Sequence, residues 1–134
     1  MLKQLSLYSE NKKGTLMEIT NILTGAGINI WGSVTNDSAE FGIIRMVVSD
    51  SELAKKKLEE AGYFCRLTNV IGVEMADEVG ALNRLLKTLY DSNINVDYIY
   101  LSFNRDSGLP VQILHAADAS EVEECIKAKG FQVL

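Results

Sequence analysis

Few side chains in this chain of 134 residues could support catalysis or bind a metal. The only histidine is His115, in the apolar run VQILHAA, and the two cysteines, Cys65 and Cys125, lie far apart without a C-x-x-C spacing. A metal site would be short of ligands, and a nucleophile would lack a positioned base. We therefore expect a hydrogen-bonded strand histidine, two reduced cysteines packed as small apolar residues, no cofactor, and no enzymatic activity.

Two loops of matching pattern are more informative. Asn11 lies three positions before Gly14 and Asp77 lies three positions before Gly80, and each glycine opens a helical pattern. A helix start exposes unpaired N–H groups and the positive end of the helix dipole, which together can receive a carboxylate, and glycine lets a ligand approach the backbone. The alternative is that Asn11 and Asp77 cap the helices and the glycines only permit tight loops.

An asparagine follows each of these helices. Asn29 and Asn95 each stand between two β-branched residues at the start of a predicted strand. Because side chains alternate along a strand, a flanking residue such as Ile30 can enter the core while the amide points the other way. An amide donates and accepts, so it could hold an ammonium and a carboxylate at once, and the alternative is a plain turn residue.

These features recur because the chain is an internal repeat. The segments GTLMEITNILTGAGINI and GALNRLLKTLYDSNINV share identities at a constant separation of 66 positions, close to half the chain length. The identical pairs are Gly14 and Gly80, Leu16 and Leu82, Leu23 and Leu89, Ile28 and Ile94, and Asn29 and Asn95. A duplicated structural unit explains this separation best.

Periodicity gives the elements of each unit. In the first unit we expect strands over 2–9, 28–35, 42–49 and 63–67, a turn-bearing connection over 36–42, and helices over 16–26 and 51–61. In the second unit we expect strands over 71–75, 94–104, 110–116 and 131–134, and helices over 80–92 and from about 121. Ser120 and Glu123 form a predicted capping box, and Gly130 ends that last helix. The loop NRDSGLP is two residues longer than its counterpart.

The order β-α-β-β-α-β, read twice, predicts an α+β fold of two ferredoxin-like units, residues 1–67 and 68–134. Each unit should be an antiparallel sheet with helices on one face. The joint FCRLTNVIG is apolar and free of proline, unlike a flexible linker, so we expect the units to pack directly and rigidly together.

The charge distribution narrows the range of partners. The formal net charge is −5 and the acidic residues are spread along the chain, which argues against binding to nucleic acid. The start of the chain has no apolar stretch of signal-peptide length, and the run GIIRMVV is short and interrupted by Arg45. We expect a cytoplasmic protein without a membrane partner.

The repeated pattern Asn-x-x-Gly-x-Leu, an amphipathic helix and Gly-Ile-Asn-Ile resembles the ACT domain, an amino-acid-sensing module attached to many enzymes of amino-acid metabolism. The resemblance covers nearly the whole chain and implies a free-standing tandem ACT protein. It implies an effector site from the loop, the helix start and the asparagine of each unit. The implied ligand-binding residues are Ser9, Asn11, Lys13, Gly14, Thr15, Leu16, Asn29, Ile30, Asp77, Val79, Gly80, Ala81, Leu82 and Asn95.

The sequence departs from the family pattern at several of these positions. The proline that usually precedes the glycine is Lys13 in one unit and Val79 in the other, and the histidine of serine-binding members is Ser9 or Met75 here. The serine specificity is therefore not carried over. Because Asp77 would repel a ligand carboxylate, we expect two unequal sites.

The resemblance implies a regulatory protein that binds a free amino acid and acts allosterically on an enzyme of amino-acid metabolism. Family members commonly bind their amino acid at an interface between two ACT units, so a homodimer is expected. The alternative is an assembly subunit in which the ligand pocket is vestigial.

Overall fold

The computed structural model describes residues 1–10, 12–36 and 42–134. Asn11 and the greater part of the connection predicted over 36–42 lie outside the described residues. The chain divides into two compact units, Lys3–Thr68, here called the N-terminal unit, and Asn69–Leu134 with Met1–Leu2, here called the C-terminal unit.

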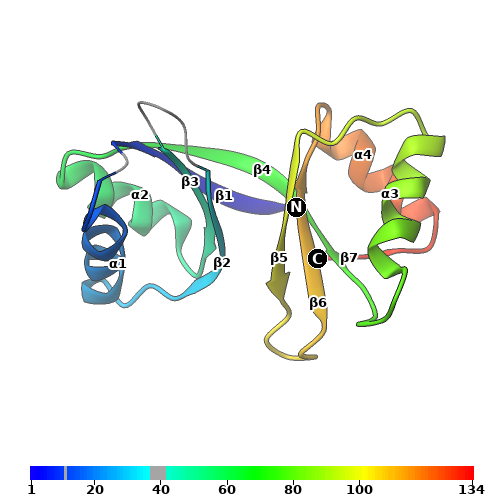
Figure 1. Ribbon diagram of the computed structural model, residues 1–134, viewed down its shortest axis with the longest axis horizontal. Helices are drawn as coiled ribbons and strands as arrows, with labels where there is room; N and C mark the ends of the chain where they lie inside the picture. Colours follow the sequence, from blue (N-terminus) through cyan, green and yellow to red (C-terminus); the bar gives the residue numbers. More distant parts are fainter. Residues whose placement is uncertain (11, 37–41) are drawn as a thin grey trace. The chain divides into compact units, whose positions relative to one another are not determined.

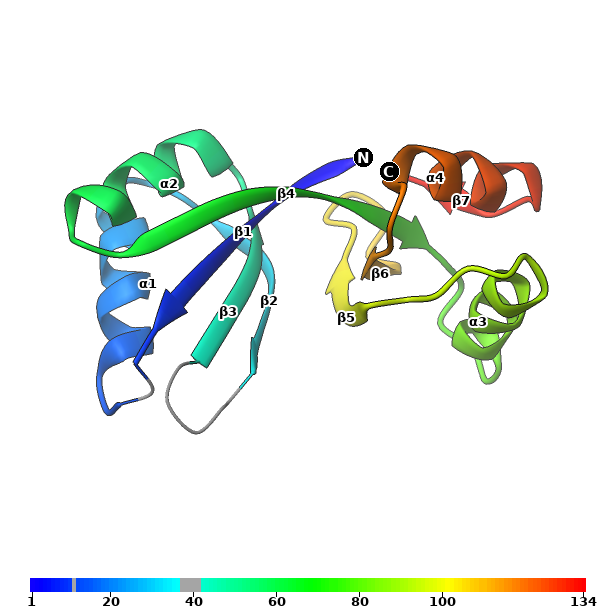
Figure 2. The same ribbon diagram turned by 90° about the horizontal axis from the view of Figure 1, so that it is seen from above.

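The N-terminal unit has the β-α-β-β-α-β order that the sequence predicts. Its elements are β1 (Leu2–Ser9), α1 (Thr15–Gly25), β2 (Ile30–Asn36), β3 (Gly42–Val48), α2 (Ser51–Glu60) and the first part of β4 (Phe64–Glu74). The strand order is β2-β3-β1-β4. Strand β3 pairs antiparallel with β1 and with β2, and both α1 and α2 lie on one face of the sheet (Figure 1, Figure 2).

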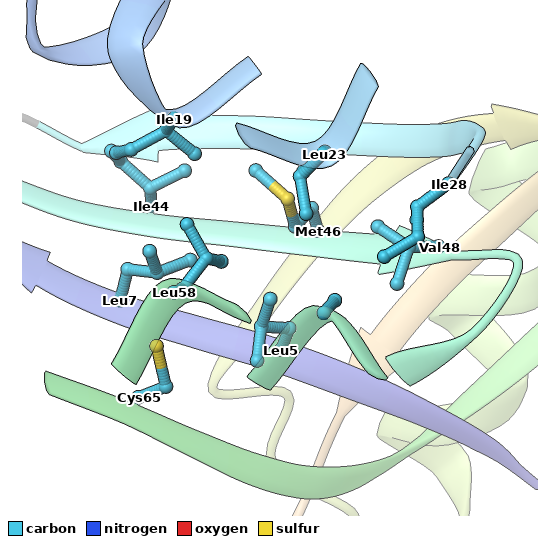
Figure 3. Packing of buried hydrophobic residues seen from close by; sticks show 11 residues of the cluster. Leu5, Leu7, Ile19, Leu23, Ile28, Ile44, Met46, Val48, Leu58 and Cys65 are labelled. Carbon is cyan, nitrogen blue, oxygen red and sulfur yellow. The ribbon is translucent and has the colours of Figure 1, made fainter. Parts of the chain in front are cut away.

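The core of this unit lies between the sheet and its two helices. Every second residue of β1, Leu5 and Leu7, faces the helices and is fully buried. Ile19 and Leu23 come from one face of α1 at helical spacing and are also fully buried. Figure 3 shows these side chains packed with Ile44 and other residues of the sheet. The middle of β1 is buried on both faces, because the polar residues between the leucines, Gln4 and Ser6, are buried as well.

The C-terminal unit repeats the arrangement. Its elements are the second part of β4, α3 (Ala81–Asp91), β5 (Tyr98–Phe103), β6 (Pro110–His115), α4 (Ala119–Ala128) and β7 (Gln132–Val133). Strand β6 pairs antiparallel with β4 and β5, and β7 pairs with β4, which gives the order β7-β4-β6-β5. Both α3 and α4 cover one face of this sheet (Figure 2).

Strand β4 corrects one sequence prediction. We expected two short strands, 63–67 and 71–75, whereas one strand of 11 residues runs from Phe64 to Glu74. No proline interrupts this segment, so nothing in the backbone chemistry ends the first strand. Gly72 lies within the strand, at a point where the Leu2 side chain packs against the backbone. A Cβ atom there would lie 2.8 Å from Leu2 Cδ1.

Two further boundaries differ from the prediction. Strands β2 and β5 begin at Ile30 and Tyr98, later than expected, because the chain still closes the preceding helices there: the N–H groups of Ile28 and Ile94 donate to carbonyls of α1 and α3. The last strand is reduced to Gln132–Val133.

The predicted capping box of α4 is wrong. The helix starts at Ala119, and its N-cap residue is Asp118, whose side chain makes no capping hydrogen bond. Ser120 therefore lies within the first turn. Glu123 turns to other partners, because its carboxylate lies 2.9 Å from the Met1 amine and 3.4 Å from Lys127 Nζ.

Candidate ligand-binding site

The loops that lead into α1 and α3 have the same backbone structure. Three backbone N–H to carbonyl hydrogen bonds recur in both units with the same N···O distances of 3.1, 3.3 and 2.9 Å. In the N-terminal unit they run from Lys12 to Glu10, from Thr15 to Lys12 and from Glu18 to Gly14. In the C-terminal unit they run from Glu78 to Ala76, from Ala81 to Glu78 and from Arg84 to Gly80. Every residue in the second set stands 66 positions after its counterpart. The duplication therefore preserved the loop conformation as well as the element order.

Glycine starts both helices for a conformational reason. Gly14 and Gly80 have φ angles of 91° and 89°, in the left-handed region that residues with a Cβ atom rarely adopt. Among the described residues, no side chain caps either helix start. The N–H groups of Thr15 and Ala81 donate to loop carbonyls, but the next two N–H groups of each first turn have no acceptor within the helix, and the dipole adds a partial positive charge there. Each helix start can therefore receive an anionic group.

In the N-terminal unit this helix start borders a pocket of about 390 Å³. The pocket lies where the end of β1, the loop, the first turn of α1 and the β2–β3 hairpin strands come together. Its lining residues are Ser9, Glu10, Lys12, Lys13, Gly14, Thr15, Leu16, Met17, Thr35, Gly42 and Ile44. The structure thus brings together five of the predicted site residues, namely Ser9, Lys13, Gly14, Thr15 and Leu16.

Sequence reasoning missed the walls that the sheet supplies. Thr35 and Ile44 are paired across β2 and β3, and Gly42 pairs with Ser9 of β1. These residues lie 20 or more positions from the loop, so no local motif could have placed them beside it. Met17 was missed although it follows the predicted Leu16 directly, and helical spacing could have suggested it.

The loop end of this pocket carries charges of both signs. The Lys12 Nζ atom lies 3.7 Å from a Glu10 carboxylate oxygen, and both side chains are largely exposed. Thr15 and Ser9 each donate a hydroxyl hydrogen bond of 3.4 Å to the Glu10 carbonyl, which fixes the end of β1 against the start of α1. The loop can therefore present both an acidic and a basic group to a zwitterion.

Asn29 and Ile30 lie elsewhere in the unit. They follow the C-terminal end of α1, whereas the loop precedes its N-terminal end, about 16 Å away along a helix of this length. The Asn29 backbone exchanges two hydrogen bonds with Ser49, each of 2.9 Å, and Ile30 packs against the core. The exposed amide of Asn29 and the loop therefore belong to opposite ends of one unit.

The loop of the C-terminal unit presents different side chains. Asp77 and Gly80 are exposed, and Val79 is fully exposed. Ala81 is buried, and Leu82 is partly exposed. The neighbouring Glu78 forms an ion pair of 2.8 Å with Arg84 across the first turn of α3, and no counterpart of this pair is formed by Lys12 and Glu18 among the described contacts.

A pocket next to this second loop has a different lining. It measures about 600 Å³ and lies between α3 and the end of the unit. Of the predicted site residues only Ala81 lines it, together with Met75, Ala76, four residues of α3 and the segment from Lys129 to Gln132. The two loops therefore share their backbone, whereas these two pockets have different linings.

Asn95 lies in an acidic setting. It lines a pocket of about 430 Å³ with Asp97, Asp118 and Glu121 among others. Its amide donates to Asp97 Oδ1 at 3.4 Å, and the other carboxylate oxygen of Asp97 lies 2.8 Å from His115 Nδ1. The Tyr98 ring stacks on the His115 ring with centroids 5.1 Å apart. His115 is a hydrogen-bonded strand residue, as the sequence predicted.

The two cysteines lie in different surroundings. Burial raises the pKa of the Cys65 thiol to about 11, so it stays protonated near neutral pH. Cys125 donates a hydrogen bond of 3.4 Å to the Ser92 hydroxyl. Within the described ranges, no group of three or more histidine, cysteine, aspartate or glutamate side chains could hold a metal ion, and no helix there is long and apolar enough to cross a membrane.

Two ferredoxin-like units, each with a glycine-initiated helix behind the same loop, define a tandem regulatory module of the ACT type. The family model for the ACT domain pair matches residues 1–133, and the chain belongs to this family. The resemblance read from the repeated motif is confirmed. No curated protein sequence matches the chain.

Solved structures show the same fold. Protein BT0572 from Bacteroides thetaiotaomicron is 30% identical, with a TM-score of 0.90 over 99% of this chain and 91% of that one. The ligand-free regulatory subunit of aspartate kinase from Thermus thermophilus is 14% identical, with a TM-score of 0.69 over 94% and 91% of the two chains. A structure of the aspartokinase α and β subunits is 17% identical, with a TM-score of 0.61 over 96% of each chain.

Proposed function

We propose that the protein is a regulatory protein that binds a free amino acid in the loop pocket of its N-terminal unit. The observation that carries the proposal is the pocket itself: a helix start with uncapped N–H groups, behind a left-handed glycine, borders a cavity of about 390 Å³. That volume falls at the lower end of the range of small-molecule sites, which suits a single amino acid.

The geometry suggests how such a ligand would be held. The effector carboxylate would accept hydrogen bonds from the first-turn N–H groups of α1, where the helix dipole favours negative charge. The ammonium would lie near the Glu10 carboxylate, and the lysine side chains of the loop would add to the attraction for the carboxylate. The side chain of the effector would then point away from the loop, toward Thr35 and Ile44.

The effect of binding would be regulatory and not catalytic. An effector that prefers one arrangement of the protein, or one complex with a partner, shifts that equilibrium by its differential affinity. The fold shared with regulatory subunits of aspartate kinase supports an enzyme of amino-acid metabolism as the class of partner. We propose residues 1–67 and 68–134 as the two domains of this regulator.

A thermal-shift screen against the common amino acids tests the proposal. A ligand present at 100 times its dissociation constant should add about 2.7 kcal/mol to the free energy of unfolding and raise the midpoint by several degrees. Thr35→Leu narrows the pocket from an exposed position on β2 and should reduce the shift given by the effector that the wild-type protein binds best. Thr24→Leu makes the same change on an exposed part of α1 outside the pocket and should keep it. A flat screen would refute the proposal.

We also propose that the protein is a homodimer, because α3 carries an exposed apolar stripe. Leu82, Leu86 and Tyr90 are each four residues apart, so they lie along one face of α3, with exposed fractions of 38%, 38% and 83%, and the fully exposed Val79 lies in the loop just before the helix. The counterparts in the N-terminal unit, 66 positions earlier, are mostly polar: Lys13, Leu16, Thr20 and Thr24. The stripe therefore belongs to the C-terminal unit and not to the repeat as such.

A second copy of the chain is the occupant that also explains Asn95. If α3 pairs antiparallel with α3 of the copy, the end of one helix lies beside the start of the other. Asn95 of the second copy then lies near the loop of Asp77 and Gly80 of the first copy. Within one copy, Asn95 and this loop lie at opposite ends of α3.

Sedimentation velocity tests the dimer. Tyr90→Glu puts a charge on the most exposed aromatic residue of the stripe and should weaken dimerisation by about tenfold or more. Thr24→Glu, at the equivalent exposed position of α1, should leave the dimer intact. A wild-type chain that sediments as a monomer would refute this part of the proposal, whereas a dimer with a flat amino-acid screen would favour a purely assembly role.

A further inference from the structure

The pocket of the N-terminal unit has two ends of different chemistry. The charged side chains that line it, Glu10, Lys12 and Lys13, all belong to the loop. The remaining described walls come from the first turn of α1 and from the sheet, and the described residues that form them have no ionisable side chain. A ligand held by its carboxylate and ammonium at the loop would therefore direct its side chain into an uncharged compartment.

Apolar atoms dominate this compartment. Ile44 is almost fully buried and joins the pocket to the core, while Leu16 and Met17 border it from α1 with exposed fractions of 48% and 66%. The described sheet and helix walls carry three hydroxyl groups, and those of Ser9 and Thr15 donate to the Glu10 carbonyl, which leaves the Thr35 hydroxyl. A charged or amide side chain placed there would lose water without gaining matching partners, at a cost in affinity.

The C-terminal unit shows that the repeat does not require these walls. The pair Thr35 and Ile44 on β2 and β3 corresponds to the pair Leu101 and Gln112 on β5 and β6. The wall of Gly42, opposite Ser9, is occupied in the second unit by Pro110. The second unit thus keeps the loop backbone but has larger groups at the Thr35 and Gly42 positions and the amide of Gln112 at the position of Ile44.

We infer that the N-terminal pocket selects an amino acid with an uncharged apolar side chain of the size of valine, leucine, isoleucine or methionine. The inference rests on the proposed function, since it assumes that the loop holds the effector's carboxylate and ammonium. Leu16, Met17 and Ile44 are the residues that contact the effector's side chain, and Thr35 with Gly42 sets how large that side chain can be.

Calorimetric titration with matched ligands tests this selection. Leucine, asparagine and aspartate have side chains of similar size and different polarity, so they separate shape from charge. We expect leucine to bind about tenfold or more tightly than asparagine, and aspartate to bind least. The full-length protein is titrated, with D-leucine as the control for recognition of the ammonium and carboxylate.

Two variants locate the selectivity. Ile44→Gln introduces the residue type that the C-terminal unit has at this position, Gln112. It should reduce the affinity for leucine by about tenfold and change the affinity for asparagine much less. Because Ile44 belongs to the core, the exposed Thr35→Leu serves as a second variant: by narrowing the pocket it should favour alanine over leucine.

The outcomes separate this inference from the proposed function. If no amino acid binds, the proposed function fails and the inference fails with it. If asparagine or aspartate binds as tightly as leucine and Thr35→Leu weakens that binding, the site is an amino-acid site and only the inferred selectivity is wrong. Tight leucine binding that neither variant alters would also overturn the inference, since the selecting residues would lie elsewhere.

Discussion

Two glycines of the N-terminal unit should respond to alanine substitution with opposite signs. Gly14 has a φ of 91° at the start of α1, and Gly25 is the last residue of the same helix with ordinary helical backbone. A Cβ atom added at either position meets no heavy atom within 4 Å. Sterics outside the backbone therefore cancel, and the difference between the two variants reports backbone conformation alone.

The magnitudes follow from backbone energetics. A left-handed residue with a Cβ atom costs about 1–2 kcal/mol, part of which is offset by the reduced entropy of the unfolded chain, so Gly14→Ala should destabilise the unit by about 1 kcal/mol. Gly25→Ala improves helix propensity and should stabilise it by about 0.5–1 kcal/mol. With a urea m-value of about 1–2 kcal/mol per M, the midpoints should move apart by about 1 M.

Urea unfolding followed by tryptophan fluorescence measures the difference. Trp31 is the single tryptophan of the chain and lies on β2, so it reports on the N-terminal unit. Gly14→Asn is a useful control, because asparagine tolerates the left-handed region and should recover part of the loss. If both alanine variants shift the midpoint in the same direction, the left-handed start of α1, and with it the proposed loop geometry, is wrong.

Three further predictions concern the rest of the chain. Leu85 is fully buried in the core of the C-terminal unit, so Leu85→Ala should cost about 2–5 kcal/mol in urea unfolding. Cys125 should react with iodoacetamide in the native state before Cys65, whose pKa is raised to about 11 by burial. Because the Cys65 thiol ionises at a lower pH in the unfolded chain than in the folded protein, the free energy of unfolding should fall as pH rises between about 9 and 11. Asn93 has a φ of 58°, so Asn93→Ala should lower the thermal midpoint and Asn93→Gly should not.

The sequence was most informative where the repeat constrains the backbone. The separation of 66 positions links Gly14 to Gly80 and reappears in the hydrogen bonds of both loops. It also links Gly27 to Asn93, which both have a positive φ angle after their helices. Because few residues other than glycine and asparagine adopt a positive φ angle easily, this conformation restricts the residue type. The restriction recurs at the equivalent position of both units, which makes it recognisable in the sequence.

Features that depend on contacts between distant segments could not be predicted in the same way. Thr35 and Ile44 join the pocket only through the register of β2 with β3, and neither residue differs in type from an ordinary strand residue. The capping box at Ser120 failed because Glu123 found stronger partners in the Met1 amine and Lys127. Local patterns set local geometry, and tertiary contacts overrode them where a charged side chain had a better partner.

A titration of the protein with leucine, followed by backbone-amide NMR, would show whether the N-terminal pocket binds an amino acid, because it reports which residues contact the ligand. We expect shifts of the Leu16 and Met17 amides at the start of α1 and of Ile44 on β3, with smaller changes in the matching loop at Gly80. Shifts confined to the Gly80 loop, or no shifts at millimolar leucine and at millimolar concentrations of the other amino acids, would contradict it.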